Sequence, residues 1–83
     1  MTFEQAQEKA MQYAKENGYS TIRNAGERDG YWYFHFFNVY PHRMFLGLPH
    51  YVKVNQRTDA LIYVEDFYEM MWALKQEKLI NNV

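Results

Sequence analysis

The three histidines, His35, His42 and His50, are the side chains of this sequence best suited to bind a metal ion. A zinc site would need two or more of them to converge with carboxylates such as Glu65 or Asp66. Their spacings along the chain are seven and eight residues, which match no zinc-ligand pattern. We therefore predict no metal site and no cofactor, and we expect His35 to be a hydrogen-bonded residue on the face of a sheet.

Hydrolytic chemistry would need a nucleophile beside a base, and the sequence offers few candidates. Ser20 is the only serine, and it lacks the flanking glycines of a nucleophile elbow. Glu65 and Asp66 are adjacent carboxylates, but neighbouring residues of a strand point to opposite faces. Asp66 is better explained as the residue that caps a helix. The sequence thus predicts no catalytic residues and a protein that is not an enzyme.

Composition narrows the class of partner. The chain has 83 residues, enough for a single domain over residues 1–83, and 19% of them are aromatic. Nine basic residues are balanced by ten acidic ones, which argues against nucleic-acid binding. No apolar run approaches the roughly 20 residues needed to cross a bilayer, so we expect no membrane partner. The lack of cysteine excludes disulfides and is compatible with the cytoplasmic location that we expect.

The elements that must position these side chains begin with a helix. Thr2 and Gln5 form a capping box, and apolar residues then recur at helical spacing. Gly18 stands where a helix commonly ends. We predict a helix over residues 3–17, followed by a short strand or an extended link at 19–22.

Residues 31–40 predict one long strand. Seven of these ten residues are aromatic, and aromatic side chains fit the surface of a pleated sheet. The polar residues 24–30, which include two glycines, predict a loop or hairpin turn before it. Pro41 ends the strand because it cannot donate a hydrogen bond to a neighbouring strand. The segment 41–49 then follows as an apolar loop.

Residues 50–55 and 60–65 are rich in valine, isoleucine and tyrosine and predict two strands. The polar turn 56–59 joins them in a hairpin. Asp66 then caps a second helix that runs to about residue 79. This order predicts an α+β fold with an N-terminal helix, a three- to four-stranded antiparallel sheet and a C-terminal helix.

The hairpin Tyr51–Val64 resembles the terminal hairpin of PepSY-like and cystatin-like α+β modules. In those modules a strand of the form Tyr-x-Val-x-Val leads through Asn or Asp and a Thr-Gly turn to a second apolar strand. Asp59 takes the place of that glycine here. The layout of roughly residues 3–78 is also similar to that of small bacterial immunity-type proteins. The resemblance implies a non-enzymatic protein that binds another protein, such as a toxin or a protease domain.

Alternation along the strands divides the sheet residues between two faces. One face is expected to pack against the first helix and to hold Trp32, Phe34, Phe36, Val52, Val54, Ile62 and Val64. The opposite face is expected to hold Tyr31, Tyr33, His35, Tyr51, Lys53 and Tyr63. Tyrosine is enriched at interfaces, so this second face is either a partner-binding platform or a second core beneath the second helix. A bulge at Phe36 and Phe37 would instead turn Phe37 and Val39 inward.

Two other segments carry a large amount of apolar surface. In the second helix, Tyr68 and Trp72 lie beside a stripe formed by Phe67, Met70, Met71 and Leu74. This surface is wider than a normal amphipathic face, so half of it meets a second copy or a partner, or the whole face is internal. In the segment 41–49, the apolar side chains either cover the sheet edge or form an interaction tip, with Arg43 as a charged residue beside Phe45.

A small non-enzymatic protein-binding module of the immunity or inhibitor type is our leading hypothesis. The alternative is a homodimer with a structural or regulatory role, joined through the second sheet face or the second helix. A single-stranded nucleic-acid or small-molecule binder is the third alternative, because aromatic sheet faces also stack bases. The predicted partner-binding residues are Tyr31, Tyr33, His35, Tyr51, Lys53, Tyr63, Arg43 and Phe45.

Overall fold

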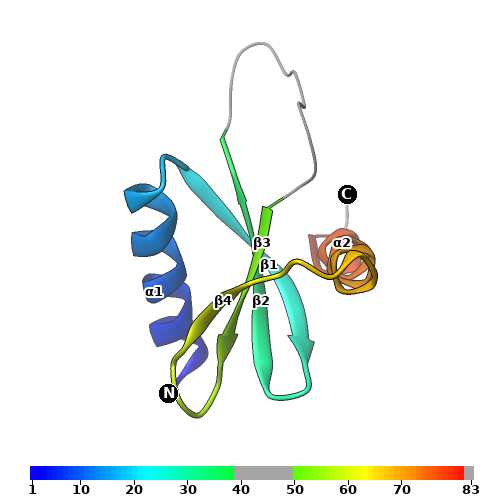
Figure 1. Ribbon diagram of the computed structural model, residues 1–83, viewed down its shortest axis with the longest axis horizontal. Helices are drawn as coiled ribbons and strands as arrows, with labels where there is room; N and C mark the ends of the chain where they lie inside the picture. Colours follow the sequence, from blue (N-terminus) through cyan, green and yellow to red (C-terminus); the bar gives the residue numbers. More distant parts are fainter. Residues whose placement is uncertain (39–49, 82–83) are drawn as a thin grey trace.

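A four-stranded antiparallel sheet lies between two helices in the computed structural model, which describes residues 1–38 and 50–81 (Figure 1). The strands follow one another across the sheet in chain order. The α+β fold expected from the sequence, with three to four strands, is confirmed, and the sheet has four. The elements are α1 (Phe3–Glu16), β1 (Thr21–Arg28), β2 (Tyr31–Phe37), β3 (His50–Asn55), β4 (Leu61–Tyr63) and α2 (Phe67–Asn81).

Helix α1 forms where the capping box and the alanine spacing predict it. The Thr2 hydroxyl accepts the backbone N–H of Gln5, and the Gln5 side chain accepts the backbone N–H of Thr2. Ala6, Ala10 and Ala14 recur every four residues and are fully buried against the sheet. Small side chains on this line let the helix approach the sheet closely. The first core forms between α1 and the sheet residues Phe34, Phe36, Val52 and Val54.

Strand β1 is longer than the sequence predicts. Most of the polar segment 24–30 is strand, and the turn itself is only Asp29 and Gly30, with φ values of 53° and 81°. Two residues with positive φ form the tight turn that matches the twist of a hairpin. The glycine at position 26 marks a β-bulge between Asn24 and Glu27, not a loop. An edge strand with a bulge tolerates the polar residues that indicated a loop.

Pairing of β2 with β3 confirms the predicted division of these two strands between faces. Trp32 pairs with Val54 and Phe34 with Val52 on the α1 side. The pairs Tyr33 with Lys53 and His35 with Tyr51 lie on the other side. The alternative bulge at Phe36 and Phe37 is absent, because both residues pair in regular register with Ile22 and Thr21 of β1. Val39, the other residue of that alternative, lies outside the described residues.

The prediction of which β4 residues lie on which face of the sheet is wrong, because the strand is shifted by one residue. Val54 pairs with Leu61 and Val52 pairs with Tyr63, and directly opposed residues share a face. Leu61 therefore packs in the first core, and the ring centroid of Tyr63 lies 5.8 Å from that of Tyr13 in α1. Ile62 and Val64, expected beside α1, fall on the other face. Val64 is buried there beneath α2.

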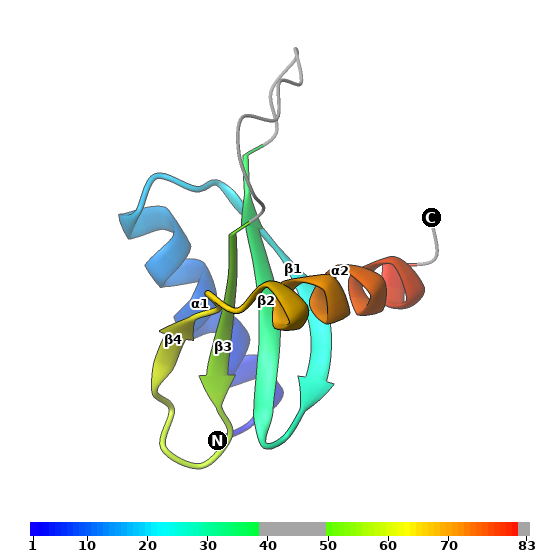
Figure 2. The ribbon, with the colours of Figure 1, turned by 45° about the vertical axis from the view of Figure 1, so that its right-hand side comes forward.

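Helix α2 covers the second face of the sheet. Asp66 caps it as predicted, since its Oδ2 atom accepts the backbone N–H of Glu69 at 3.0 Å. Figures 1 and 2 show that α2 runs across the strands, whereas α1 runs alongside them. Its inner side packs a second core in which Ala73 is buried, and Trp72, Met70 and Leu74 are half-buried.

Candidate partner-binding surface

Two tyrosines of the second sheet face, Tyr33 and Tyr51, are interior residues. Tyr33 and Tyr51 have exposed fractions of only 2% and 0%, and they pack in the second core with Ala73 of α2. Of the two alternatives left open by the sequence, the structure shows the second core covered by the second helix. The predicted platform is therefore the surface on which the protein's own helix α2 docks.

One half of α2 docks through Glu69. Its Oε2 atom accepts hydrogen bonds from the hydroxyl of Tyr33 at 2.7 Å and from Nζ of Lys53 at 2.9 Å. Nζ of Lys53 also lies 4.8 Å from the ring centroid of Tyr31, which extends this contact to the rim of the face. The Tyr33 bond lowers the pKa of Glu69, and Lys53 adds to this effect against the opposing effect of burial. Burial and the bond to Glu69 raise the pKa of Tyr33 to about 12.

The other half of α2 docks through Glu77, whose side chain is buried. Its carboxylate accepts the Tyr51 hydroxyl at 2.8 Å and lies 3.0 Å from Nδ1 of His35. Nη1 of Arg23 lies 3.5 Å from the same carboxylate. Burial alone would raise the pKa of Glu77, but the bonds from His35 and Tyr51, with the charge of Arg23, outweigh it and lower the pKa. The His35 ring is also stacked on the Tyr51 ring, with centroids 4.6 Å apart. Its contact with Glu77 confirms that His35 is a hydrogen-bonded residue of the sheet face.

These clusters connect the sheet to α2. Burial and the bond to Glu77 raise the pKa of Tyr51. Both tyrosine hydroxyls and both carboxylates bind one another across the interface between sheet and helix. Within residues 1–38 and 50–81, no group of three or more histidine or acidic side chains is placed to hold a metal ion.

The remaining predicted residues fall into three groups. Tyr63 was expected on the second face, but its pairing with Val52 places it on the α1 side, where it is 38% exposed. Arg43 and Phe45 lie outside the described residues, so the structure places neither of them. His35 and Lys53 face α2 and are engaged by its carboxylates.

The outward side of α2 is apolar and exposed. Phe67, Tyr68 and Met71 have exposed fractions of 57%, 82% and 51%. Helical spacing places them on one side with three exposed residues of the later turns. We call this side the α2 outer face, and it consists of Phe67, Tyr68, Met71, Lys75, Lys78 and Leu79. The sequence indicated this face, because the apolar residues of the second helix are spread more widely than one buried helix face requires.

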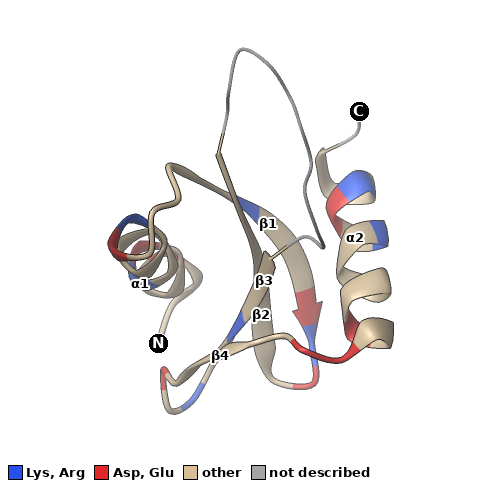
Figure 3. Cartoon of the chain, turned by 45° about the horizontal axis from the view of Figure 1, so that its top comes forward, with Lys and Arg blue, Asp and Glu red and all other residues tan. Residues whose placement is uncertain are grey.

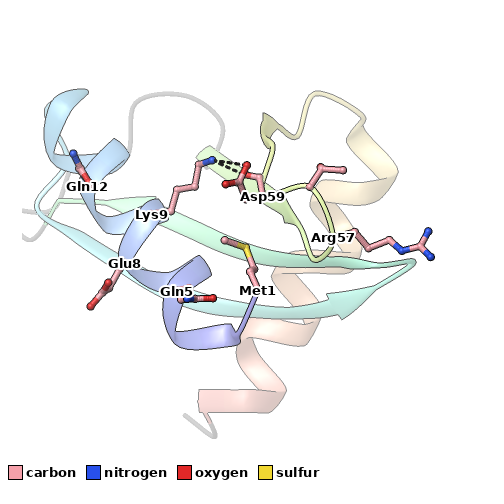
Figure 4. Close-up of a pocket in the computed structure, with 8 residues that line it drawn as sticks. Met1, Gln5, Glu8, Lys9, Gln12, Arg57 and Asp59 are labelled. Carbon is pink, nitrogen blue, oxygen red and sulfur yellow. Dashed lines mark hydrogen bonds and ion pairs between the residues drawn. The ribbon is translucent and has the colours of Figure 1, made fainter.

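A polar hollow on the other side of the molecule lies between α1 and the turn that joins β3 to β4 (Figure 4). Lys9 reaches across it to Asp59, with Nζ and Oδ1 3.3 Å apart. Glu8 and Arg57 point away from the hollow in Figure 4. Its charged groups therefore do not converge on one point, as a binding site for a small ligand requires.

Comparison with known proteins gives no relative of this chain. No family model, no curated protein and no solved structure matches it. The resemblance to PepSY-like and cystatin-like modules consequently stays a prediction.

Neither α1 nor α2, the helices of the described ranges 1–38 and 50–81, is long and apolar enough to cross a membrane.

Proposed function

We propose that this protein is a non-enzymatic protein-binding module whose partner docks on the α2 outer face. The observation that carries the proposal is the exposure of Phe67, Tyr68 and Met71 side by side on one helix. Leaving such a side chain in water forgoes about 1.5–3 kcal/mol of burial. Aromatic residues and methionine are enriched in protein interfaces, and clustered exposed apolar groups mark interaction sites.

The contacts beneath α2 support this use of its outer face. Glu69 and Glu77 fix the two halves of the helix to the sheet through hydrogen bonds to Tyr33 and Tyr51. A helix held at two places presents its opposite side in one orientation. Such preorganisation lowers the entropy lost when a partner binds. The tyrosine face thus contributes to binding by supporting the helix that meets the partner.

The immunity- or inhibitor-type role expected from the layout is part of the proposal, and so is the cytoplasmic location. A helix with exposed aromatic residues can cover an apolar groove on another protein, which is a common mode of helix recognition. The chain contains no cysteine and requires no oxidising compartment to fold.

Photo-crosslinking in the cells that make the protein tests this proposal. A benzoylphenylalanine at position 68 should form a covalent adduct with a protein chain upon irradiation. The same group at Gln12, an exposed residue of α1, serves as the matched control and should give no adduct. Equal adducts at both positions, or none at position 68, would overturn the proposal. The mass of the adduct identifies its partner.

A further inference from the structure

We propose that the α2 outer face docks on the same face of a second copy of this chain, with the two helices antiparallel. This inference rests on the proposed function, because it names the partner of the same surface. The contact would be isologous, so that each residue pair occurs twice about a twofold axis.

The charges along α2 favour a second copy as the occupant. Glu65 and Asp66 immediately precede the helix, whereas Lys75 and Lys78 are exposed on its later turns. Figure 3 shows the acidic residues at the start of α2 and the basic residues on the outer side of its second half. An antiparallel pair places the acidic start of each helix beside the basic half of the other. A parallel pair would place lysines beside lysines, which costs free energy.

The spacing of these residues indicates a register. With the twofold axis between positions 71 and 72, Tyr68 of one copy faces Lys75 of the second copy. Glu65, in the link just before the helix, then lies near Lys78 of the second copy. Met71, which is 51% exposed, then lies at the centre of the contact. The pair of Tyr68 and Lys75 places an ammonium group over an aromatic ring, a contact worth about 0.5–1 kcal/mol at an exposed site. The outer pair is an ion pair.

The arrangement of the described residues, 1–38 and 50–81, leaves room for this contact. The outer face points away from the sheet, and the later turns of α2 extend beyond β1 in Figure 2. A second helix can therefore lie along α2 without displacing any strand. A single pair of helices buries an area near or below the roughly 1,200 Å² lower limit of stable complexes, so the dimer should dissociate in the micromolar range.

Sedimentation equilibrium of the full chain tests the inference. We expect a monomer–dimer equilibrium, with a Kd at least about tenfold higher in Lys78→Glu and in Glu65→Lys, because each variant opposes like charges twice. The double variant Lys15→Glu/Arg57→Glu, which changes exposed basic residues away from α2, should leave the Kd unchanged.

A mixture of the two variants tests the antiparallel register. Lys78→Glu and Glu65→Lys should form a heterodimer, because both inter-helix pairs are then of opposite charge. Failure of the mixture to associate while the wild type dimerises would overturn the antiparallel register. A wild-type chain that stays monomeric at several hundred micromolar would overturn the dimer.

The two proposals fail separately. A monomeric chain whose position 68 crosslinks to a different protein would refute the second copy as partner and leave the proposed function standing. A monomeric chain without any adduct at position 68 would refute both.

Discussion

The hydroxyl of Tyr51 in β3 donates a 2.8 Å hydrogen bond to the carboxylate of Glu77 in α2. Tyr51 is fully buried and Glu77 nearly so, with an exposed fraction of 6%. A buried carboxylate is costly unless its oxygens are satisfied, and here the tyrosine, His35 and Arg23 surround it. The bond is therefore a polar anchor inside an aromatic core. The bond joins β3 to α2, the helix that covers the second face of the sheet.

Tyr51→Phe should lower the free energy of unfolding by about 1–2 kcal/mol, because the change removes one donor from a buried carboxylate while keeping the ring. Urea unfolding followed by circular dichroism measures this loss. Tyr68→Phe is the matched control, since its hydroxyl belongs to a side chain that is 82% exposed. Equal stability of Tyr51→Phe and the wild type would show that the bond does not hold α2.

The faces of β2 and β3 could be predicted from the sequence because alternation along a strand has one solution once Phe34 and Val52 face a core. The facing of β4 could not, since the strand is only three residues long and its register depends on the preceding turn. The length of β1 could not be predicted either, because Asn24 and Gly26 are turn-type residues that here form a bulge.

The position of α2 could not be predicted for a different reason. Tyrosines at positions 33 and 51 suit an open platform and a polar-tipped core equally well. Glu69, Ala73 and Glu77 recur every four residues and line the inner side of α2. In the sequence, acidic residues at this spacing indicate a solvent face. Only their tyrosine partners, remote in the chain, direct these carboxylates toward the sheet.

Acidification should weaken the fold through Glu69 and Glu77. Both carboxyls have a pKa lowered from the ordinary value of 4.5, so the folded state favours their ionised form. Their contribution to stability is complete above about pH 4.5 and is lost as the pH falls through the folded pKa values. The urea midpoint should therefore fall on acidification below that point. The double variant Glu69→Gln/Glu77→Gln should show a shallower fall, and an unchanged slope would exclude these carboxyls as the cause.

Alkaline conditions should weaken the same interface through its tyrosines. The pKa of Tyr33 is raised from 10.0 to about 12, and burial raises that of Tyr51 as well. The folded state thus favours the neutral phenols, and their contribution is complete below pH 10 and declines as the pH rises toward the folded values. Tyrosinate absorbance should show a phase at strongly alkaline pH that coincides with unfolding. Tyr33→Phe should reduce this phase, and an unchanged phase would show that Tyr33 does not contribute to it.

Gly26→Ala should separate α2 from the bulge of β1. Gly26 has a φ of 102°, and a Cβ atom there would lie 3.1 Å from Cβ of Gln76 and 3.3 Å from the Trp72 ring. We expect a loss of about 2–3 kcal/mol in the free energy of unfolding, from backbone strain and from the contact together.

Gly18→Ala is the matched control: its φ is 85°, but nothing lies within 4 Å of the added carbon. The control should lose only about 1–2 kcal/mol, the strain component. Equal losses would mean that α2 does not pack closely on the bulge.

Trp72 and Met71 are neighbours in α2 with opposite roles, and substitution should distinguish them. The Trp72 ring lies 4.9 Å from the Tyr33 ring and carries the Arg28 guanidinium at 4.3 Å, so it contributes to the second core. Trp72→Ala should cost about 2–3 kcal/mol of unfolding free energy, less than a fully buried tryptophan because the ring is half-buried.

Met71→Ser should cost at most about 0.5 kcal/mol in dilute monomer, since its side chain faces outward. Urea unfolding at low concentration measures both changes, and at high concentration Met71→Ser should also lose the protection that a docked partner gives the wild type. A large loss for Met71→Ser in dilute monomer would place this side chain in the core and remove the basis for a binding face on the outside of α2.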